Sequence, residues 1–365
     1  MSILFEPKAI GNLTLKNRFI KSSTAESMAG SNGEVTQPML EFYEAIARGG
    51  AACIFLGHAF VHLLGRAHPR MTGIHEDSLI SGLRLLAEVI HRHECYVFAQ
   101  LNHGGSRVQE GYTEPVGPSA LPHPLTGALA RELAPQEIWE IVESFARAAG
   151  RAREAGLDGV LIHGGHGYSV SLFTSPLTNR RTDEWGEGVQ GRSRFLEEIY
   201  RSVRKAVGPD YPVAVKLGVK DDAEGGLSAE DGASVAGRLA ETGIDAIEVS
   251  GGIPTKEAGA DRRDILSREK EAYFLPYAKA VRPKVGQLPL SLVGGLRSPQ
   301  FMEEIVTAGW VDFVSLARPF ICESDLISKI RGGRWDPVSC TSCDRCRAGF
   351  AQEGLRCRRD EEPPA

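Results

Sequence analysis

The sequence lacks the long apolar runs of a membrane protein and any excess of positive charge. Of its 365 residues 42% are hydrophobic, but no stretch approaches the length of a membrane span. Lys and Arg number 42 against 47 Asp and Glu, a formal net charge of -5. Because this balance gives no bias towards polyanions, we expect neither a membrane nor nucleic acid as a partner.

A secretory leader and a disulfide framework are also missing. Glu6 and Pro7 lie where a leader would have its apolar region. Of the seven cysteines, three are scattered and four crowd into residues 340–357, which is not the spacing of a secreted disulfide scaffold. We therefore expect a cytoplasmic protein.

Short β-rich runs and helical patterns alternate eight times along the chain. Several helices end at Gly-Gly, Ala-Gly or Thr-Gly, which are C-cap signals that lead into the next strand. Eight such units predict an α/β protein with one (β/α)8 TIM barrel over residues 1–333, followed by a cysteine-rich tail over 334–365. The predicted strands are 19–23, 52–57, 96–101, 159–163, 213–218, 246–250, 290–294 and 312–317, and the predicted helices are 37–48, 79–91, 135–154, 192–207, 229–241, 268–281, 299–307 and 323–330.

The motif His163-Gly-Gly-His166-Gly-Tyr168 directly follows the predicted strand 159–163. In a TIM barrel the chemistry lies at this end of the strands. Two imidazoles three residues apart can hydrogen-bond one carbonyl oxygen, and the phenol can donate a proton beside them. On these residues alone, a metal-binding or merely polar loop is the alternative. The more loosely scattered histidines His58, His62, His68 and His75 are interpreted as loop residues, because their spacing fits no single metal geometry.

The other strand ends suggest a flat, anionic ligand that carries a phosphate. Polar Gln100 and cationic Lys216 would meet its edge. Small residues at the last two strand ends let backbone N–H groups approach a phosphate, and an arginine adds charge. Together they suggest flavin mononucleotide (FMN). These strand ends are Ser23-Thr24-Ala25, Gly57, Gln100, Lys216, Gly294-Gly295 and Ala317-Arg318.

Along nearly the whole barrel the chain resembles the old yellow enzyme family of flavin oxidoreductases. Motifs typical of that family occur in the family's order, and they include Leu4-Phe-Glu-Pro-Lys, Gln100-Leu-Asn-His-Gly-Gly, residues 155–168, 173–186, 293–297 and 317–326. The resemblance implies an NAD(P)H-dependent enzyme that uses FMN. The implied substrates are small α,β-unsaturated carbonyl compounds, namely enones, enals or enoyl thioesters.

The resemblance also implies a role for each strand-end residue. Gln100 matches a glutamine that hydrogen-bonds the flavin pyrimidine ring, and Lys216 replaces the family's usual arginine beside flavin N1 and O2. Ser23, Thr24 and Ala25 would lie along the flavin ring, whereas Gly294, Gly295, Ala317 and Arg318 match the phosphate site.

In the implied reaction, His163 and His166 hold the substrate's carbonyl oxygen and Tyr168 protonates the α-carbon after hydride has reached the β-carbon. Ala25 and Lys216 depart from the family's usual residues and leave the redox potential and the substrate open. Two alternatives remain for the function. One is a flavin demethylase or amine dehydrogenase that passes electrons through a C-terminal cluster to a partner. The other is a non-catalytic barrel with a zinc-stabilised interaction tail.

The tail carries Cys340-x-x-Cys343-x-x-Cys346 and then Cys357. Four thiols so close together suit an iron–sulfur cluster or tetrahedral zinc. The tail is similar in its placement to that of 2,4-dienoyl-CoA reductase and trimethylamine dehydrogenase, which implies a [4Fe–4S] cluster held by these four cysteines. Zinc and unmetallated thiols are the alternatives. With a cluster, an electron-transfer protein would be a partner.

Overall fold

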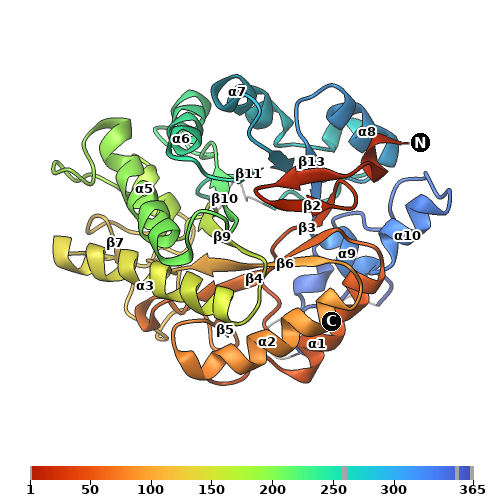
Figure 1. The fold of residues 1–365 in the computed structure, drawn as a ribbon. Coiled ribbons are helices and arrows are strands. Elements are labelled where there is room, and N and C mark those ends of the chain that lie inside the picture. Colours follow the sequence, from red (N-terminus) through yellow and green to blue (C-terminus); the bar gives the residue numbers. More distant parts are fainter. Residues whose placement is uncertain (1, 256–260, 350–352, 362–365) are drawn as a thin grey trace.

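The computed structural model describes residues 2–255, 261–349 and 353–361. Within these ranges, eight parallel strands close into a barrel, because β3 pairs with both β4 and β13. Figure 1 shows the strands at the centre and the helices around them. The predicted TIM barrel is confirmed. Its strands are β3 (Phe19–Lys21), β4 (Cys53–Phe60), β6 (Tyr96–Asn102), β9 (Gly159–Gly164), β10 (Val213–Gly218), β11 (Ala246–Ser250), β12 (Leu290–Leu292) and β13 (Phe313–Leu316).

The main helices cover the outside of the barrel, and their capping residues explain where they begin and end. In α6, the Ser228 hydroxyl accepts a hydrogen bond from the Asp231 amide at 3.0 Å, and Gly243 ends the helix in the left-handed conformation. The helices are α1 (Gln37–Arg48), α2 (Ile80–His91), α3 (Pro135–Glu154), α5 (Gly188–Val207), α6 (Ala229–Thr242), α7 (Leu275–Val285), α8 (Pro299–Thr307) and α10 (Leu326–Arg331).

Helix α7 begins later than the sequence pattern predicts. Residues 268–281 were expected to be helical, but Arg268–Lys270 forms only a 3₁₀ turn and α7 starts at Leu275. Pro276 fits this start, because proline has no N–H to donate and its fixed φ suits the first turn of a helix. The helix therefore begins beside this proline and does not run through it.

The barrel strands are buried along nearly their whole length, as expected for a parallel sheet covered by helices. A two-stranded hairpin, β1 (Lys8–Ile10) and β2 (Leu13–Leu15), packs at one end of the barrel. Its Ile10 and Leu15 belong to the same apolar cluster as Ile20, Phe98 and Phe313 of the barrel strands. Because this cluster fills one end of the barrel, the opposite end, where the strands finish, is left for polar side chains.

Short elements connect these units. Two of them follow strand ends directly: α4 (Ser169–Thr174) comes after β9, and α9 (Arg318–Cys322) comes after β13. The remaining short elements are the strands β5 (Thr72–Gly73), β7 (Val116–Gly117) and β8 (Arg131–Glu132), and the 3₁₀ turns Ile3–Phe5, Leu63–Gly65, Asp77–Leu79 and Arg345–Arg347.

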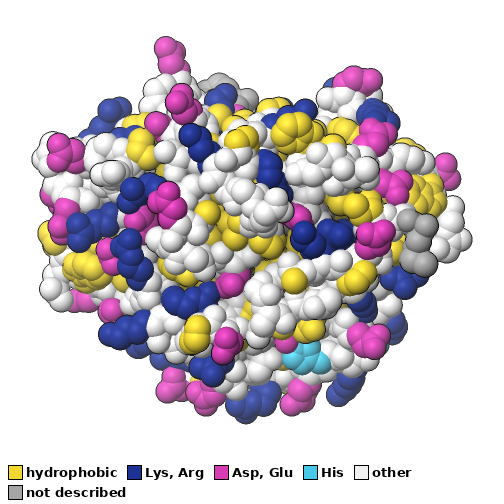
Figure 2. Space-filling view, turned by 45° about the horizontal axis from the view of Figure 1, so that its top comes forward, with side chains coloured by type: hydrophobic (Ala, Val, Ile, Leu, Met, Phe, Trp, Pro, Cys, Tyr) yellow, Lys and Arg dark blue, Asp and Glu magenta, His cyan; other side chains and the backbone are white. Residues whose placement is uncertain are grey.

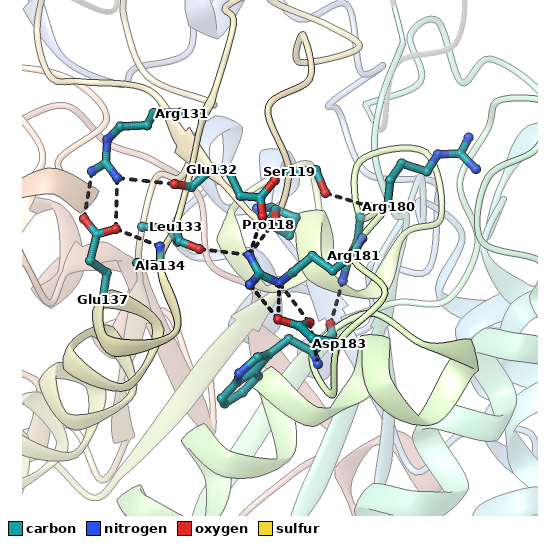
Figure 3. Close-up of polar contacts among 12 residues, drawn as sticks. Pro118, Ser119, Arg131, Glu132, Leu133, Ala134, Glu137, Arg180, Arg181 and Asp183 are labelled. Carbon is teal, nitrogen blue, oxygen red and sulfur yellow. Dashed lines mark hydrogen bonds and ion pairs between the residues drawn. The ribbon is translucent and has the colours of Figure 1, made fainter.

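Arg181 ties the long loop after β6 to the loop after α4 (Figure 3). Its guanidinium donates to the carbonyls of Pro118 and Leu133 at 3.1 and 2.8 Å, and it forms an ion pair with Asp183 at 2.6 Å. The Arg181 side chain is only 6% exposed. The side chain of Arg180 instead points away from these groups, and only its amide takes part, donating to Ser119 Oγ.

On the face seen in Figure 2, cationic and anionic side chains are interspersed, in keeping with the nearly balanced charge count. No helix in the described ranges is both long and apolar enough to cross a membrane.

We predict that Arg181→Ala loosens the loop over residues 107–133. The variant loses two charged hydrogen bonds to backbone carbonyls and the ion pair with a half-exposed Asp183, so we expect about 1–3 kcal/mol less free energy of unfolding. Urea unfolding and limited proteolysis would measure both effects. Arg180→Ala, which removes an exposed side chain next door, should leave both unchanged. Equal effects of the two variants would contradict the anchoring role.

Candidate active site

A cavity of about 270 Å³ opens at the end of the barrel where the strands finish. It brings together most of the residues predicted from the strand ends. Of the predicted set, Ser23, Thr24, Ala25, Gln100, His163, His166, Tyr168, Lys216, Ala317 and Arg318 line it, together with Cys346 of the tail. Gly57, Gly294 and Gly295 are not among the lining residues.

Lys216 and Gln100 supply the polar floor of this cavity. In the parallel register, Lys216 of β10 lies beside His163 of β9 and Glu248 of β11. Its Nζ forms a buried ion pair with Glu248 at 2.9 Å and donates to Ser22 Oγ at 3.0 Å. Gln100 is buried, and its Nε2 has no hydrogen-bond partner among the described residues. An unsatisfied buried donor is costly, so a ligand carbonyl at this position would satisfy it.

The three glycines contribute through the backbone. The amide of Gly57 already donates to Tyr43 Oη at 2.7 Å, and a Cβ at this position would lie 1.6 Å from Glu26 Oε2. Gly57 therefore serves the packing beneath the cavity. Gly294 and Gly295, with φ of 122° and 72°, follow the lining residue Val293, and side chains at either position would collide with Tyr273. They allow the backbone to turn closely around this corner.

The histidine motif forms a compact group at the end of β9. The ring centroids of His163 and His166 are 5.4 Å apart and nearly perpendicular, and the Tyr168 ring lies 4.9 Å from His163. His166 adopts a φ of +61°, which is uncommon outside glycine and turns the chain sharply here. Its Nε2 lies 2.8 Å from Ser250 Oγ, so β11 fixes this imidazole.

Both imidazoles of the motif are neutral. Burial, followed by the charges of His166 and Lys216, holds the pKa of His163 well below its usual range. Burial and then Lys216 lower the pKa of His166 to about 3. His163 Nδ1 accepts from the Gly165 amide at 3.4 Å, which leaves its proton on Nε2. Neutral imidazoles of this kind can donate hydrogen bonds to a substrate oxygen without carrying a charge themselves.

His58 and His68 also line the cavity; His68 lies in a loop as predicted, whereas the prediction of a loop is wrong for His58. His58 lies in β4, and its Nε2 is 3.3 Å from His68 Nε2. The Tyr168 ring lies 5.1 Å from the His58 ring. The spacing of these histidines does not predict that they line the cavity. The position of His58 near the carboxyl end of a strand could have identified it as a cavity residue. His62 and His75 are not among the lining residues.

Two further buried titratable residues, Lys21 and Glu26, flank the cavity residues 22–25 in sequence and were missed from the sequence. Burial lowers the pKa of Lys21 to about 8, and it raises the pKa of Glu26. Glu26 accepts hydrogen bonds from Tyr43 Oη at 3.1 Å and from Thr72 Oγ1 at 3.3 Å. The Glu26 carbonyl accepts from the Leu355 amide at 2.9 Å, so the tail is tied to the wall of the cavity.

The tail cysteines converge on one smaller cavity of about 20 Å³ beside the first. Cys340, Cys343, Cys346 and Cys357 all line it, and so does Cys322 of α9. Arg318, Asp344 and Cys346 line both cavities, so the tail site lies on the same end of the barrel as the histidine motif.

Cys322 was not assigned to the tail site from the sequence, although it ends α9, the short helix that follows β13. Burial raises the pKa of Cys322 and of Cys346 to about 12. Among the described residues, no three His, Cys, Asp or Glu side chains are arranged as a formed metal site.

Comparisons with known proteins agree with this geometry. A family model described as "NADH:flavin oxidoreductase / NADH oxidase family" matches residues 3–336. The NADH oxidase of Thermoanaerobacter brockii is 35% identical over 99% of this chain and 56% of its own length, and the NADPH dehydrogenase of Geobacillus sp. is 34% identical over 88% of this chain and 91% of its own.

A solved structure of 2-naphthoyl-CoA reductase with 2-naphthoyl-CoA is also similar. It superposes with a TM-score of 0.87 at 28% identity, over 95% of this chain and 54% of that one. The chain thus spans about half the length of the first curated relatives it matches.

We predict that the stability of the protein falls as the pH drops below about 6.5. The pKa values of His58, His103, His163 and His166 are lowered by burial, that of His103 to about 3. Below about 6.5 the unfolded chain binds protons that the folded chain does not, which costs about 1.4 kcal/mol per pH unit for each such histidine. Unfolding in urea at pH 7.5, 6.0 and 5.0 would measure the slope.

His103→Asn should reduce the slope of unfolding free energy against pH by about 1.4 kcal/mol per pH unit, the contribution of one proton. His103 suits this test because it is buried against Ser169 and does not line the cavity. A stability that does not change between pH 7 and 5 would contradict the neutral state of these imidazoles. Carboxylates with a lowered pKa, such as Glu323 with a pKa of about 2, change the free energy of unfolding only at a pH below this range.

Proposed function

The chain belongs to the NADH:flavin oxidoreductase / NADH oxidase family, and from this we propose that it is an FMN-dependent ene-reductase that uses NAD(P)H. This membership confirms the resemblance to the old yellow enzyme family. The proposed substrate is a small α,β-unsaturated carbonyl compound. Because the chain covers about half of its first relatives, the proposal concerns the chemistry of this barrel.

One observation carries the proposal: the neutral pair His163 and His166 lies in one cavity with Tyr168 and with the polar floor made by Gln100 and Lys216. Two neutral donors suit a carbonyl oxygen on which negative charge develops. A phenol beside them suits proton delivery to carbon. The same pair argues against the amine dehydrogenase alternative, since an amine offers these donors no carbonyl oxygen.

The residues present fit FMN. The unpaired Nε2 of buried Gln100 suits a ring carbonyl, and the buried cation of Lys216 suits an edge that becomes anionic on reduction. Arg318 lines the cavity with Val293, and its guanidinium suits the phosphate. Bound FMN would supply hydride exchange with nicotinamide and with the substrate.

The chain's own residues then have distinct tasks. His163 and His166 bind and orient the substrate oxygen, and Ser250 keeps the His166 ring in place through the contact at 2.8 Å. Tyr168 gives its phenolic proton to the α-carbon of the substrate. Lys216 keeps a positive charge beneath the ring site, and Glu248 holds that ammonium in position.

The tail supports a second part of the proposal, a [4Fe–4S] cluster held by Cys340, Cys343, Cys346 and Cys357. Five sulfurs around one small cavity are the supporting observation, and tetrahedral zinc remains the alternative. Because Arg318, Asp344 and Cys346 border both cavities, a cluster would lie next to the flavin site. An electron-transfer protein is the partner that such a cluster would serve.

We predict that Tyr168→Phe leaves flavin binding and anaerobic reduction by NAD(P)H nearly unchanged and slows reoxidation by an enone. The phenol acts only in the second half-reaction, and general acid catalysis contributes about 10²–10⁴-fold. Stopped-flow absorbance of the flavin would follow each half-reaction. Tyr96→Phe, at the opposite end of the barrel, is the control and should alter neither rate. Equal slowing of both half-reactions by Tyr168→Phe would contradict the assignment of Tyr168 as the proton donor.

We also predict that Cys343→Ser lowers the iron and acid-labile sulfide of anaerobically purified protein to well below the wild-type content, because a cluster missing one thiolate is held poorly. Cys95→Ser, at the start of β6, is the matched control and should keep both. Zinc without sulfide in the wild type would favour the structural metal. Neither iron, sulfide nor zinc in the wild type would defeat the metal proposal.

A further inference from the structure

Arg107 is a half-buried cation on the substrate side of the cavity. It follows β6 in the long loop, and its Cζ lies 4.8 Å from the centre of the Tyr168 ring. Its guanidinium also donates to the His166 carbonyl. Arg107 therefore touches both the proposed proton donor and the backbone of the carbonyl-binding pair, yet neither contact neutralises its charge.

The other cations that line this cavity are paired with carboxylates. Lys216 pairs with Glu248 at 2.9 Å, and Arg347 pairs with Asp261 at 3.0 Å. Arg318 lies 3.6 Å from Asp344. Within the described ranges, Arg107 is the lining cation without a carboxylate inside 4 Å, and Asp261, whose charge does interact with it, is already paired with Arg347.

A charge left unpaired at the wall of a binding cavity points to an anionic ligand. The flavin phosphate does not account for the unpaired charge of Arg107. The proposed phosphate site, with Gly294, Gly295 and Arg318, lies at the ends of β12 and β13, whereas Arg107 lies beside the motif that follows β9. A guanidinium presents planar, paired donors that match a carboxylate. Arg107 therefore has the right chemistry for a substituent of the substrate itself.

We propose that the preferred substrate carries a carboxylate, which Arg107 binds while His163 and His166 hold the carbonyl oxygen. This inference rests on the proposed function and deepens it by naming the charge class of the substrate. Arg107 then orients the reacting double bond next to Tyr168, and a neutral enone of the same shape lacks this second attachment point.

Ligand binding tests the anion site without any turnover. The FMN-loaded protein would be titrated with 4-hydroxybenzoate and with the neutral 4-hydroxybenzamide, and each Kd would be read from the flavin absorbance. In Arg107→Gln, the Kd of 4-hydroxybenzoate should rise by about 10- to 100-fold, because its carboxylate loses a charged hydrogen-bonding partner. The Kd of 4-hydroxybenzamide should change by less than about threefold in the same variant. In Arg107→Lys, the Kd of 4-hydroxybenzoate should lie between those of wild type and Arg107→Gln. Arg180→Gln, which removes an exposed positive charge, is the control.

Turnover separates the remaining explanations. In Arg107→Gln, reoxidation by 3-oxocyclohex-1-ene-1-carboxylate should slow by a much larger factor than reoxidation by 2-cyclohexenone. Equal slowing with both enones would mean that Arg107 only positions Tyr168 and would overturn the inference. Slower reduction by NADH or NADPH with unchanged reoxidation would assign Arg107 to the nicotinamide phosphates and would also overturn it.

Failure of the ene-reductase proposal would look different from failure of this inference. In that case neither enone reoxidises the wild-type flavin, while the preference for 4-hydroxybenzoate over the amide still disappears in Arg107→Gln. Equal affinities of wild-type protein for the two ligands would instead refute the anion site, whatever the enones do.

Discussion

The ion pair between Lys216 and Glu248 is the interaction on which the rest of the site depends. Both side chains are almost fully buried, and their charged atoms are 2.9 Å apart. Burying two charges is costly, and removing one partner from such a pair usually costs about 3–5 kcal/mol. The barrel can hold Lys216 charged in its interior only because β11 places Glu248 directly beside it.

The same parallel register extends the site outward. His163 lies next to Lys216 on the neighbouring strand, and the left-handed turn at His166 brings Tyr168 back over the cavity. On the other side, the tail follows the barrel and is tied to it at Glu26 through Leu355. An apolar core, packed against the hairpin at one end of the barrel, thus supports the polar cavity at the other end.

Local patterns in the sequence were enough to predict the barrel and many of the residues that line the candidate cavity. His163, His166 and Tyr168 belong to one short motif, and Gln100 and Lys216 each lie near the end of a strand, so their placement follows from the fold. Glu248, Lys21 and Cys322 were missed, because their roles depend on neighbours distant in sequence that only the closed barrel brings near. The late start of α7 at Leu275 was missed because the helical pattern outweighed Pro276.

A crystal structure of the FMN-loaded protein with a bound phenol, such as 4-hydroxybenzaldehyde, tests the central claim most directly. We predict that the phenolic oxygen lies within hydrogen-bonding distance of both His163 and His166, about 2.7–3.2 Å, with Gln100 and Lys216 against the flavin ring. A phenol bound away from the two histidines, or a flavin bound outside this cavity, would contradict the account.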